Sequence, residues 1–156
     1  MIKLRAMTSE EFASWQTKAK ADYAADQIRV GNWTEENGQQ KAEEQFAGYL
    51  PQGLDTENHY LSLVLDATTE ETVGHVWYAV MPGSTGPTLF IASLGIDEPY
   101  RRKGYAAAVL RTLDGEARAL GTNSIRLHVF GDNTPARALY AKLGYEETNV
   151  QMVKQL

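Results

Sequence analysis

Three cations and a glycine stand together in the segment Arg101-Arg102-Lys103-Gly104-Tyr105-Ala106. The segment lies between an apolar run, 89–96, and a long helical pattern. Gly104 has no side chain, so a ligand can approach the main chain closely. A helix that begins here exposes main-chain N–H groups and the positive end of its dipole. We therefore expect this segment to bind a phosphate group.

Other well-known site motifs are missing. The chain contains neither the dinucleotide motif G-x-G-x-x-G nor the P-loop motif G-x-x-x-x-G-K-[ST]. It has no cysteine and no G-x-S-x-G elbow, so no covalent acyl-enzyme is indicated. His59, His75 and His128 have no metal-ligand spacing, and we expect no metal.

Length and charge narrow the class of protein. The 156 residues fit a single domain, 1–156, with enough chain for a hydrophobic core. A net charge of -5 argues against nucleic acid as a partner. No apolar run approaches the ~20 residues of a membrane helix, and residues 1–5 show no signal-peptide core. We expect a cytoplasmic protein that does not associate with membranes.

The N-terminal third predicts one strand and two helices. Alternation at residues 2–6 is typical of a half-buried strand. Thr8 or Ser9 before two glutamates marks a helix start, and its apolar spacing fades before Gly31. A second helix begins near Thr34 and ends at Pro51.

The remaining two thirds predict a sheet with two crossing helices. Strands are expected at 60–65, 73–80 and 89–96, then a helix from Ala106 to Leu120, a strand at 125–130, a helix at 133–143 and a last strand at 145–154. The order β-α-α-β-β-β-α-β-α-β defines an α/β class: a mixed sheet, antiparallel early and parallel across the βαβ unit, with helices on both faces.

Two blocks of sequence together resemble one family. Residues 96–106, with Arg101, Gly104 and Ala106 in the pattern R/Q-x-x-G-x-G/A after a strand, are similar to the acyl-CoA signature of the GNAT superfamily of N-acetyltransferases. Residues 133–145 resemble its distal motif, N-x-x-A-x-x-L-Y-x-K-x-G-F/Y. The element order matches over essentially the whole chain.

The resemblance implies acetyl-CoA as cosubstrate and assigns roles to two segments. Main-chain N–H groups between Arg102 and Ala107 would hold the pyrophosphate, with the cations as auxiliaries. The strand end would pair with the pantetheine arm where two parallel strands splay, and Gly95 suits a bend or bulge there. The implied cosubstrate-binding residues are Leu94, Gly95, Ile96, Arg101, Arg102, Lys103, Gly104, Tyr105, Ala106, Ala107, Asn133 and Tyr140.

Two residues of the distal motif carry implied roles beside ordinary ones. Tyr140 would protonate the departing CoA thiolate, although a tyrosine beside Leu139 and Leu143 also suits plain packing. Asn133 would contact the pantetheine or a water, and it is also a good helix N-cap. The side chain of Arg101 could bind phosphate or pair with Glu98 or Asp97.

The general base is left open by the sequence. Many family members carry a carboxylate on the strand before the signature, whereas residues 91–94 here read Ile-Ala-Ser-Leu. Ser93 could position a water instead. The three histidines titrate near neutrality, but a single histidine in a strand is more often structural.

The acceptor is an amine that the sequence does not specify. The two N-terminal helices and the antiparallel strands wall the acceptor site in this family, and they carry Tyr23, Trp33, His59 and Trp77. Such side chains could stack on a cationic amine, although Trp77 is also expected in the core. Asp55 and Glu57 could bind the charge of the amine, or be solvated.

The leading hypothesis is an acetyl-CoA-dependent N-acetyltransferase in which a primary amine, on a small molecule or peptide, attacks the thioester within a ternary complex. Main-chain donors would polarise the carbonyl. One alternative is a non-catalytic acyl-CoA-binding module, favoured by the missing carboxylate, and a weaker one is a binder of another nucleotide. The segment 145–154 could complete the sheet or pair with a second subunit, which leaves a homodimer open.

Overall fold

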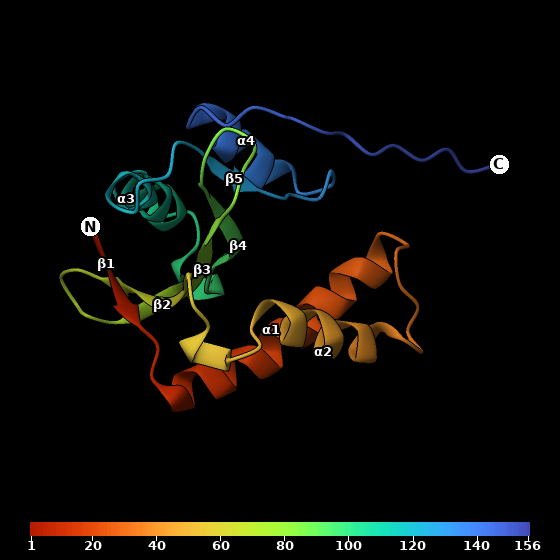
Figure 1. Cartoon of the computed structure of the whole chain (residues 1–156), viewed down its shortest axis with the longest axis horizontal. Coiled ribbons are helices and arrows are strands. Elements are labelled where there is room, and N and C mark those ends of the chain that lie inside the picture. Colours follow the sequence, from red (N-terminus) through yellow and green to blue (C-terminus); the bar gives the residue numbers. More distant parts are fainter. The chain divides into compact units, whose positions relative to one another are not determined.

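The computed structural model describes residues 1–156. The chain divides into two compact units, residues 1–126 and 127–156, and each is described by itself. The elements of the first unit are β1 (Ile2–Ala6), α1 (Ser9–Arg29), α2 (Gly38–Tyr49), η1 (Gly53–Asp55), β2 (His59–Asp66), β3 (Thr72–Met81), β4 (Thr88–Ile96), η2 (Glu98–Tyr100) and α3 (Tyr105–Ala119). β5 (Ile125–Leu127) lies at the division, and α4 (Thr134–Lys142) belongs to the second unit (Figure 1).

The strands form one mixed sheet in the order β1-β2-β3-β4-β5. The first four strands are antiparallel neighbours, with Leu61 opposite Trp77 and Trp77 opposite Ser93. Residues directly opposite each other on neighbouring strands point to the same face of the sheet, so these three residues share a face. Helices α1 and α2 cover this face, and α3 lies on the other side (Figure 1).

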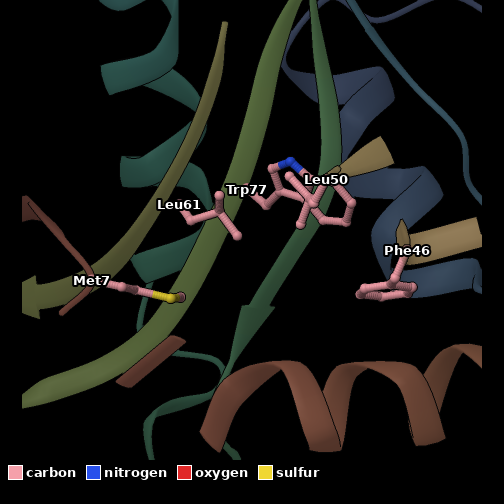
Figure 2. Close-up of a cluster of buried hydrophobic side chains, with 5 residues drawn as sticks. All are labelled: Met7, Phe46, Leu50, Leu61 and Trp77. Carbon is pink, nitrogen blue, oxygen red and sulfur yellow. The ribbon is translucent and has the colours of Figure 1, made fainter. Parts of the chain in front are cut away.

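A cluster of buried apolar side chains joins α1 and α2 to the sheet. Figure 2 shows its five buried members, Met7, Phe46, Leu50, Leu61 and Trp77, pointing into the space between the strands and the helices. Partly buried side chains close its margin: Phe12, Trp15, Ala19, Tyr23, Leu54 and Leu63. On the other side, α3 buries Val109, Leu110 and Leu113, whose spacing of one, three and four gives a single apolar face.

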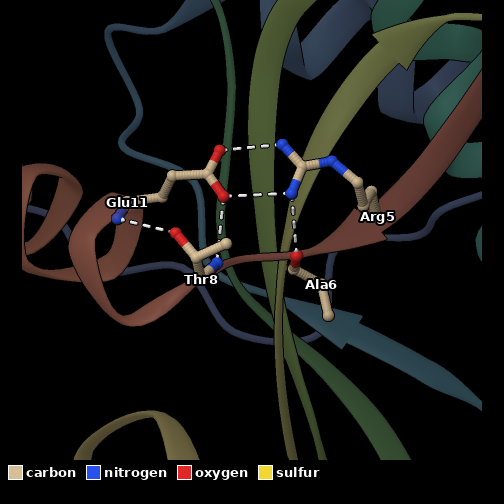
Figure 3. A network of polar contacts seen from close by, with 4 residues as sticks. All are labelled: Arg5, Ala6, Thr8 and Glu11. Atoms are coloured by element: carbon tan, nitrogen blue, oxygen red, sulfur yellow. Dashed lines mark hydrogen bonds and ion pairs between the residues drawn. The ribbon is translucent and has the colours of Figure 1, made fainter.

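The start of α1 is fixed by a capping box that an arginine extends. Thr8 Oγ1 accepts a hydrogen bond from the Glu11 N–H, and Glu11 Oε1 accepts one from the Thr8 N–H. Arg5 of β1 forms a two-pronged ion pair with Glu11, at 2.8 and 3.0 Å, and its Nη1 donates to the Ala6 carbonyl (Figure 3). The Arg5 guanidinium, followed by the Thr8 N–H, lowers the pKa of Glu11 to about 2. The turn between β1 and α1 is therefore held at both ends.

Two sequence-based boundaries need correction. The second helix begins at Gly38, not near Thr34. Thr34 and Asn37 hydrogen-bond each other's main-chain N–H groups, and this local turn replaces the first helical turn. β5 has three residues where six were expected, so Val129 lies outside it.

The predicted last strand, 145–154, is absent. Residues 145–156 have no regular structure, and Val150, Met152 and Val153 are between 67% and 88% exposed. A strand exists only where its main chain pairs with a neighbour, and alternation in the sequence does not provide that neighbour. No helix of the chain has the length and apolar character needed to cross a membrane.

Candidate active site

The basic loop, by which we mean residues 101–107, runs from the end of η2 through the first turn of α3 in an unusual backbone conformation. Arg102 has φ 61° and Gly104 has φ 86°, both in the left-handed region. A Cβ at Gly104 would meet only Met1 Cε, at 3.7 Å, which is ordinary contact. Within this structure it is therefore the backbone angle, and not crowding, that favours glycine at this position.

A row of main-chain N–H groups is left without partners by this conformation. The first helix-type bond runs from the Ala108 N–H to the Gly104 carbonyl, at 3.1 Å. The N–H groups from Arg102 through Ala107 make no hydrogen bond within the chain. Unpaired donors at a helix start, with the helix dipole behind them, form an anion-binding concavity.

The three cations of the loop are used in different ways. Arg101 Nε donates to the Ile96 carbonyl at 2.9 Å, and pairs with neither Glu98 nor Asp97. Lys103 Nζ lies 5.7 Å from the centre of the Tyr100 ring. Arg102 is exposed and makes no ion pair. Of the three side chains, that of Arg102 alone has no contact within the chain that would compete with an anion.

A contact that the sequence did not reveal anchors the end of the loop. Tyr105 Oη donates to Asp66 Oδ2 at 2.6 Å, and Asp66 Oδ1 accepts from the Thr68 and Thr69 N–H groups. The bond from Tyr105, followed by those from Thr69 and Thr68, lowers the pKa of Asp66 to about 2. An Asp-x-Thr-Thr segment indicates a turn after β2, but no local pattern connects it with a tyrosine 39 residues away.

The end of β4 keeps one edge without a neighbouring strand. β5 begins beside the start of β4, where the Leu89 N–H donates a hydrogen bond to the Ser124 carbonyl. Because β5 has three residues and β4 has nine, β5 cannot pair along the whole length of β4. Leu94, Gly95 and Ile96 pair with β3 alone. Apart from the Ile96 carbonyl, which accepts the Arg101 side chain, this edge has no neighbouring strand and offers main-chain groups to an extended ligand.

The irregularity in β4 is at Ala92 and not at Gly95, the residue whose type suits a bulge. Ser93 is opposite Trp77 and Ile91 is opposite Tyr78, so Ala92 is the extra residue of a bulge. Gly95 pairs regularly with His75. A Cβ on Gly95 would lie 2.6 Å from His75 Cε1, so the glycine makes room for the imidazole ring.

That imidazole is hydrogen-bonded to the serine of the same strand pair. His75 Nε2 and Ser93 Oγ are 2.8 Å apart, and the Trp15 ring lies 5.6 Å from the imidazole. Burial lowers the pKa of His75 to about 4, against the opposing charge of Asp97. His75 is therefore neutral at physiological pH.

The predicted acceptor-site residues belong to one connected group of rings, which we call the aromatic face: Trp15, Tyr23, Trp33, Phe46, His59 and Trp77. Neighbouring rings in it are between 5.4 and 6.3 Å apart. Trp77 is only 4% exposed and its Nε1 donates to His59 Nδ1, whose pKa is lowered by burial. The buried Nε1 of Trp15 has no hydrogen-bond partner.

Two hollows lie on the first unit. One, of about 290 Å³, is lined by Gln45, Gly48 and Tyr49, and the Tyr49 ring is 6.1 Å from that of Trp77. The other, of about 480 Å³, lies over β1 and β2 and contains none of the predicted site residues. Asp55 and Glu57 are both exposed. No group of three or more His, Cys, Asp or Glu residues is arranged to hold a metal ion.

The second unit contains the remaining predicted site residues. Asn133 Oδ1 accepts the Ala136 N–H at 3.3 Å, which confirms its place as the N-cap of α4. Tyr140 is partly buried, and burial raises the pKa of its hydroxyl. The Tyr140 ring lies 5.6 Å from that of Tyr145, and the ring of His128 lies 5.0 Å from that of Phe130.

Comparison with known proteins agrees with this combination of fold and loop. The model of the acetyltransferase (GNAT) family matches residues 10–145. Two uncharacterised N-acetyltransferases of Bacillus subtilis (strain 168) are similar: YycN is 40% identical over 156 residues, 99% of each chain, and YdgE is 38% identical over 153 residues, 98% of this chain and 97% of its own. The crystal structure of YycN superposes with a TM-score of 0.93, at 38% identity, over 100% of this chain and 99% of that one.

The chain belongs to the GNAT family of acetyltransferases. It is an acyl-CoA-dependent acetyltransferase, as the names of its relatives and the match to the family model agree. The mixed five-strand sheet with its helices is the fold of this family, as the sequence predicted.

Proposed function

We propose that the protein transfers the acetyl group of acetyl-CoA to a primary amine, by direct attack within a ternary complex. The observation that carries the proposal is the row of free N–H groups from Arg102 to Ala107, beside a strand edge that is open from Leu94 to Ile96. Acetyl-CoA supplies the acetyl group as a thioester. No cysteine is available for a covalent acyl-enzyme, so attack by the bound amine is the simplest route.

The basic loop and the free edge of β4 suit the two ends of a CoA molecule. The N–H groups at Arg102, Lys103, Gly104, Tyr105, Ala106 and Ala107 would hold the pyrophosphate. The main chain of Leu94, Gly95 and Ile96 would bind the pantetheine arm as an added strand. The side chain of Arg102 would add charge, whereas that of Arg101 fixes the loop through the Ile96 carbonyl.

The aromatic face suits the amine. Rings of Tyr23 and Trp33 can hold a cationic or apolar acceptor, and the unpaired Trp15 N–H is a donor for an acceptor oxygen. The hydrogen bond between Trp77 and His59 holds both side chains in place next to these rings. In the second unit, Tyr140 would protonate the leaving thiolate, and burial, which raises the pKa of its hydroxyl, favours the protonated form that this role requires.

We further propose that both units form one acetyltransferase domain, 1–156, since the family match runs across their division. Asn133 would contact the pantetheine while it caps α4. The acceptor is a small amine or a peptide amine, and the expected compartment is the cytoplasm. A homodimer would bury the exposed apolar side chains at 150–156.

A kinetic experiment tests the chemistry. Thiol release from acetyl-CoA is measured with a polyamine, an amino sugar, an amino-acid amide and a lysine-containing peptide, against hydrolysis without amine. With the best amine, initial rates at several concentrations of both substrates should give intersecting double-reciprocal lines. Parallel lines, together with exchange of labelled CoA into acetyl-CoA without amine, would contradict direct attack. No release with any amine would contradict the amine acceptor.

A further inference from the structure

The His75–Ser93 pair occupies the stretch of β4 in which no carboxylate is present. Residues 91–94 read Ile-Ala-Ser-Leu, and Ser93 is the only one of them with a side chain that exchanges protons. Its Oγ lies 2.8 Å from His75 Nε2. Burial keeps the imidazole neutral in the resting protein, and a neutral imidazole has one nitrogen lone pair that can accept a proton during the reaction.

The position of Ser93 connects the two halves of the proposed site. Ser93 follows directly on the bulge at Ala92, one residue before the free main-chain edge that begins at Leu94. It is also the partner of Trp77, so its side chain is on the sheet face that carries the aromatic rings. An acceptor that contacts the aromatic rings and reaches an acyl group at the free edge would come close to Ser93.

The surroundings hold the imidazole in place. The Trp15 ring lies 5.6 Å away on the side of α1, and Gly95 leaves the space that the ring fills from β4. The charged groups that act on His75 are Lys18 and Asp22 of α1 and Asp97 after β4. The two carboxylates favour a transient imidazolium, whereas Lys18 and burial oppose it.

We propose that Ser93, held by His75, receives the proton of the attacking amine. This inference rests on the proposed function. As the nitrogen–carbon bond forms and the carbon–sulfur bond breaks, the amine proton moves to Ser93 Oγ and the serine proton moves to His75 Nε2. The sulfur leaves with the electron pair of its bond to carbon. The step requires the tautomer of His75 with its proton on Nδ1, and His75 acts through Ser93, both orienting the hydroxyl and taking its proton.

The test compares Ser93→Ala with Ser93→Thr, using acetyl-CoA and the panel amine that the wild type acetylates fastest. Loss of the hydroxyl should lower kcat about 100-fold, the lower end of what a positioned proton acceptor contributes. The affinity for CoA and the melting temperature should change little. Ser93→Thr keeps a hydroxyl and should recover most of kcat. Ser62→Ala is the matched control, because Ser62 is a buried serine of β2, which β3 separates from the strand of Ser93.

The pH dependence separates a proton-transfer role from a packing role. Without Ser93 the proton must leave to solvent, so the ratio of wild-type to Ser93→Ala kcat should fall as the pH rises from 6 to 9. His75→Gln can still hydrogen-bond the serine but cannot take its proton, so it should lose kcat without losing CoA affinity. A constant ratio across pH, or a fully active His75→Gln, would overturn the proposal.

The failure of this inference can be told apart from that of the proposed function. A wild type that turns over an amine, with an equally active Ser93→Ala, overturns only the role of Ser93. A wild type that binds CoA but releases none of it with any amine overturns the acceptor chemistry, and the role of Ser93 with it.

Discussion

The basic loop and the aromatic face both belong to the first unit but present opposite kinds of surface. The basic loop offers main-chain N–H groups, and its side chains are mostly engaged elsewhere or exposed. The aromatic face offers side chains from α1, α2 and the strands, connected ring to ring. Main-chain recognition needs a conformation, which a short motif can specify. Side-chain recognition needs a set of distant residues brought together, which no single stretch of sequence specifies.

The two regions also differ in how much they contribute to the fold. Trp77 is buried against Met7, Phe46, Leu50 and Leu61, whereas Arg102, Lys103 and Gly104 are exposed (Figure 2). A change in the aromatic face should therefore affect stability and acceptor use together. A change of an exposed side chain in the basic loop should affect CoA binding and leave stability largely intact. Mutations at matched positions can test this separation.

The largest expected effect is on folding, from Trp77→Ala. Removal of a buried tryptophan should cost about 3–5 kcal/mol of unfolding free energy, measured by urea denaturation. Tyr49→Ala is the control, because its ring contacts Trp77 from an exposed position, at 49% exposure. A loss for Trp77→Ala no greater than for the control would show that the aromatic face is not part of the core.

The next effect is on CoA binding, from Gly104→Asp. The left-handed φ of 86° disfavours any side chain by roughly 1–2 kcal/mol, and a carboxylate there opposes an anion, so the Kd for CoA should rise about 100-fold. Arg102→Ala should raise it only about 2- to 5-fold, with an effect that salt reduces. Calorimetric titration measures both, and equal losses would show that side-chain charge, not the main chain, holds the phosphate.

A smaller effect is expected from the bond between Tyr105 and Asp66. Tyr105→Phe removes one hydrogen bond that anchors the start of α3, and the Kd for CoA should rise about 5-fold, or ~1 kcal/mol. Binding of pantetheine, which lacks the pyrophosphate, should not change. Tyr23→Phe is the control, because it loses a comparable bond to Gln45 in the aromatic face. An equal loss for pantetheine would mean that the bond acts on the whole site.

The smallest effect is the response of stability to acid. The folded-state pKa values of Glu11 and Asp66 are both lowered to about 2. A lowered pKa contributes stability that is present above the unfolded value near 4 and is lost as the pH falls toward 2. The melting temperature should therefore fall across this interval, and Glu11→Gln should make the fall shallower. Because both groups are on the surface, salt should reduce the effect. A Glu11→Gln profile as steep as that of the wild type would contradict this assignment.

The elements with strong local patterns were predictable from the sequence, and those that depend on a neighbour were not. Helices α1 and α3 and strands β2 to β4 lie within one or two residues of the expected positions. Helix α2, however, starts at Gly38, and β5 is shorter than expected. The strand expected at 145–154 is absent, because apolar alternation there has no paired strand to complete it. The bulge was expected at the glycine, yet it lies at Ala92, while Gly95 accommodates the His75 ring.

By itself the sequence determined the family, the basic loop and the helix that follows it. The signals for the loop and the helix are local, because the glycine, the helix start and the charged residues all lie within a few residues of one another. The tertiary structure alone decided which side chains support that loop and which could move a proton. The bond of Tyr105 to Asp66 spans 39 residues and that of His75 to Ser93 spans 18. Such contacts arise only when strands pair in one register, since a shift of one residue would turn Ser93 to the opposite face.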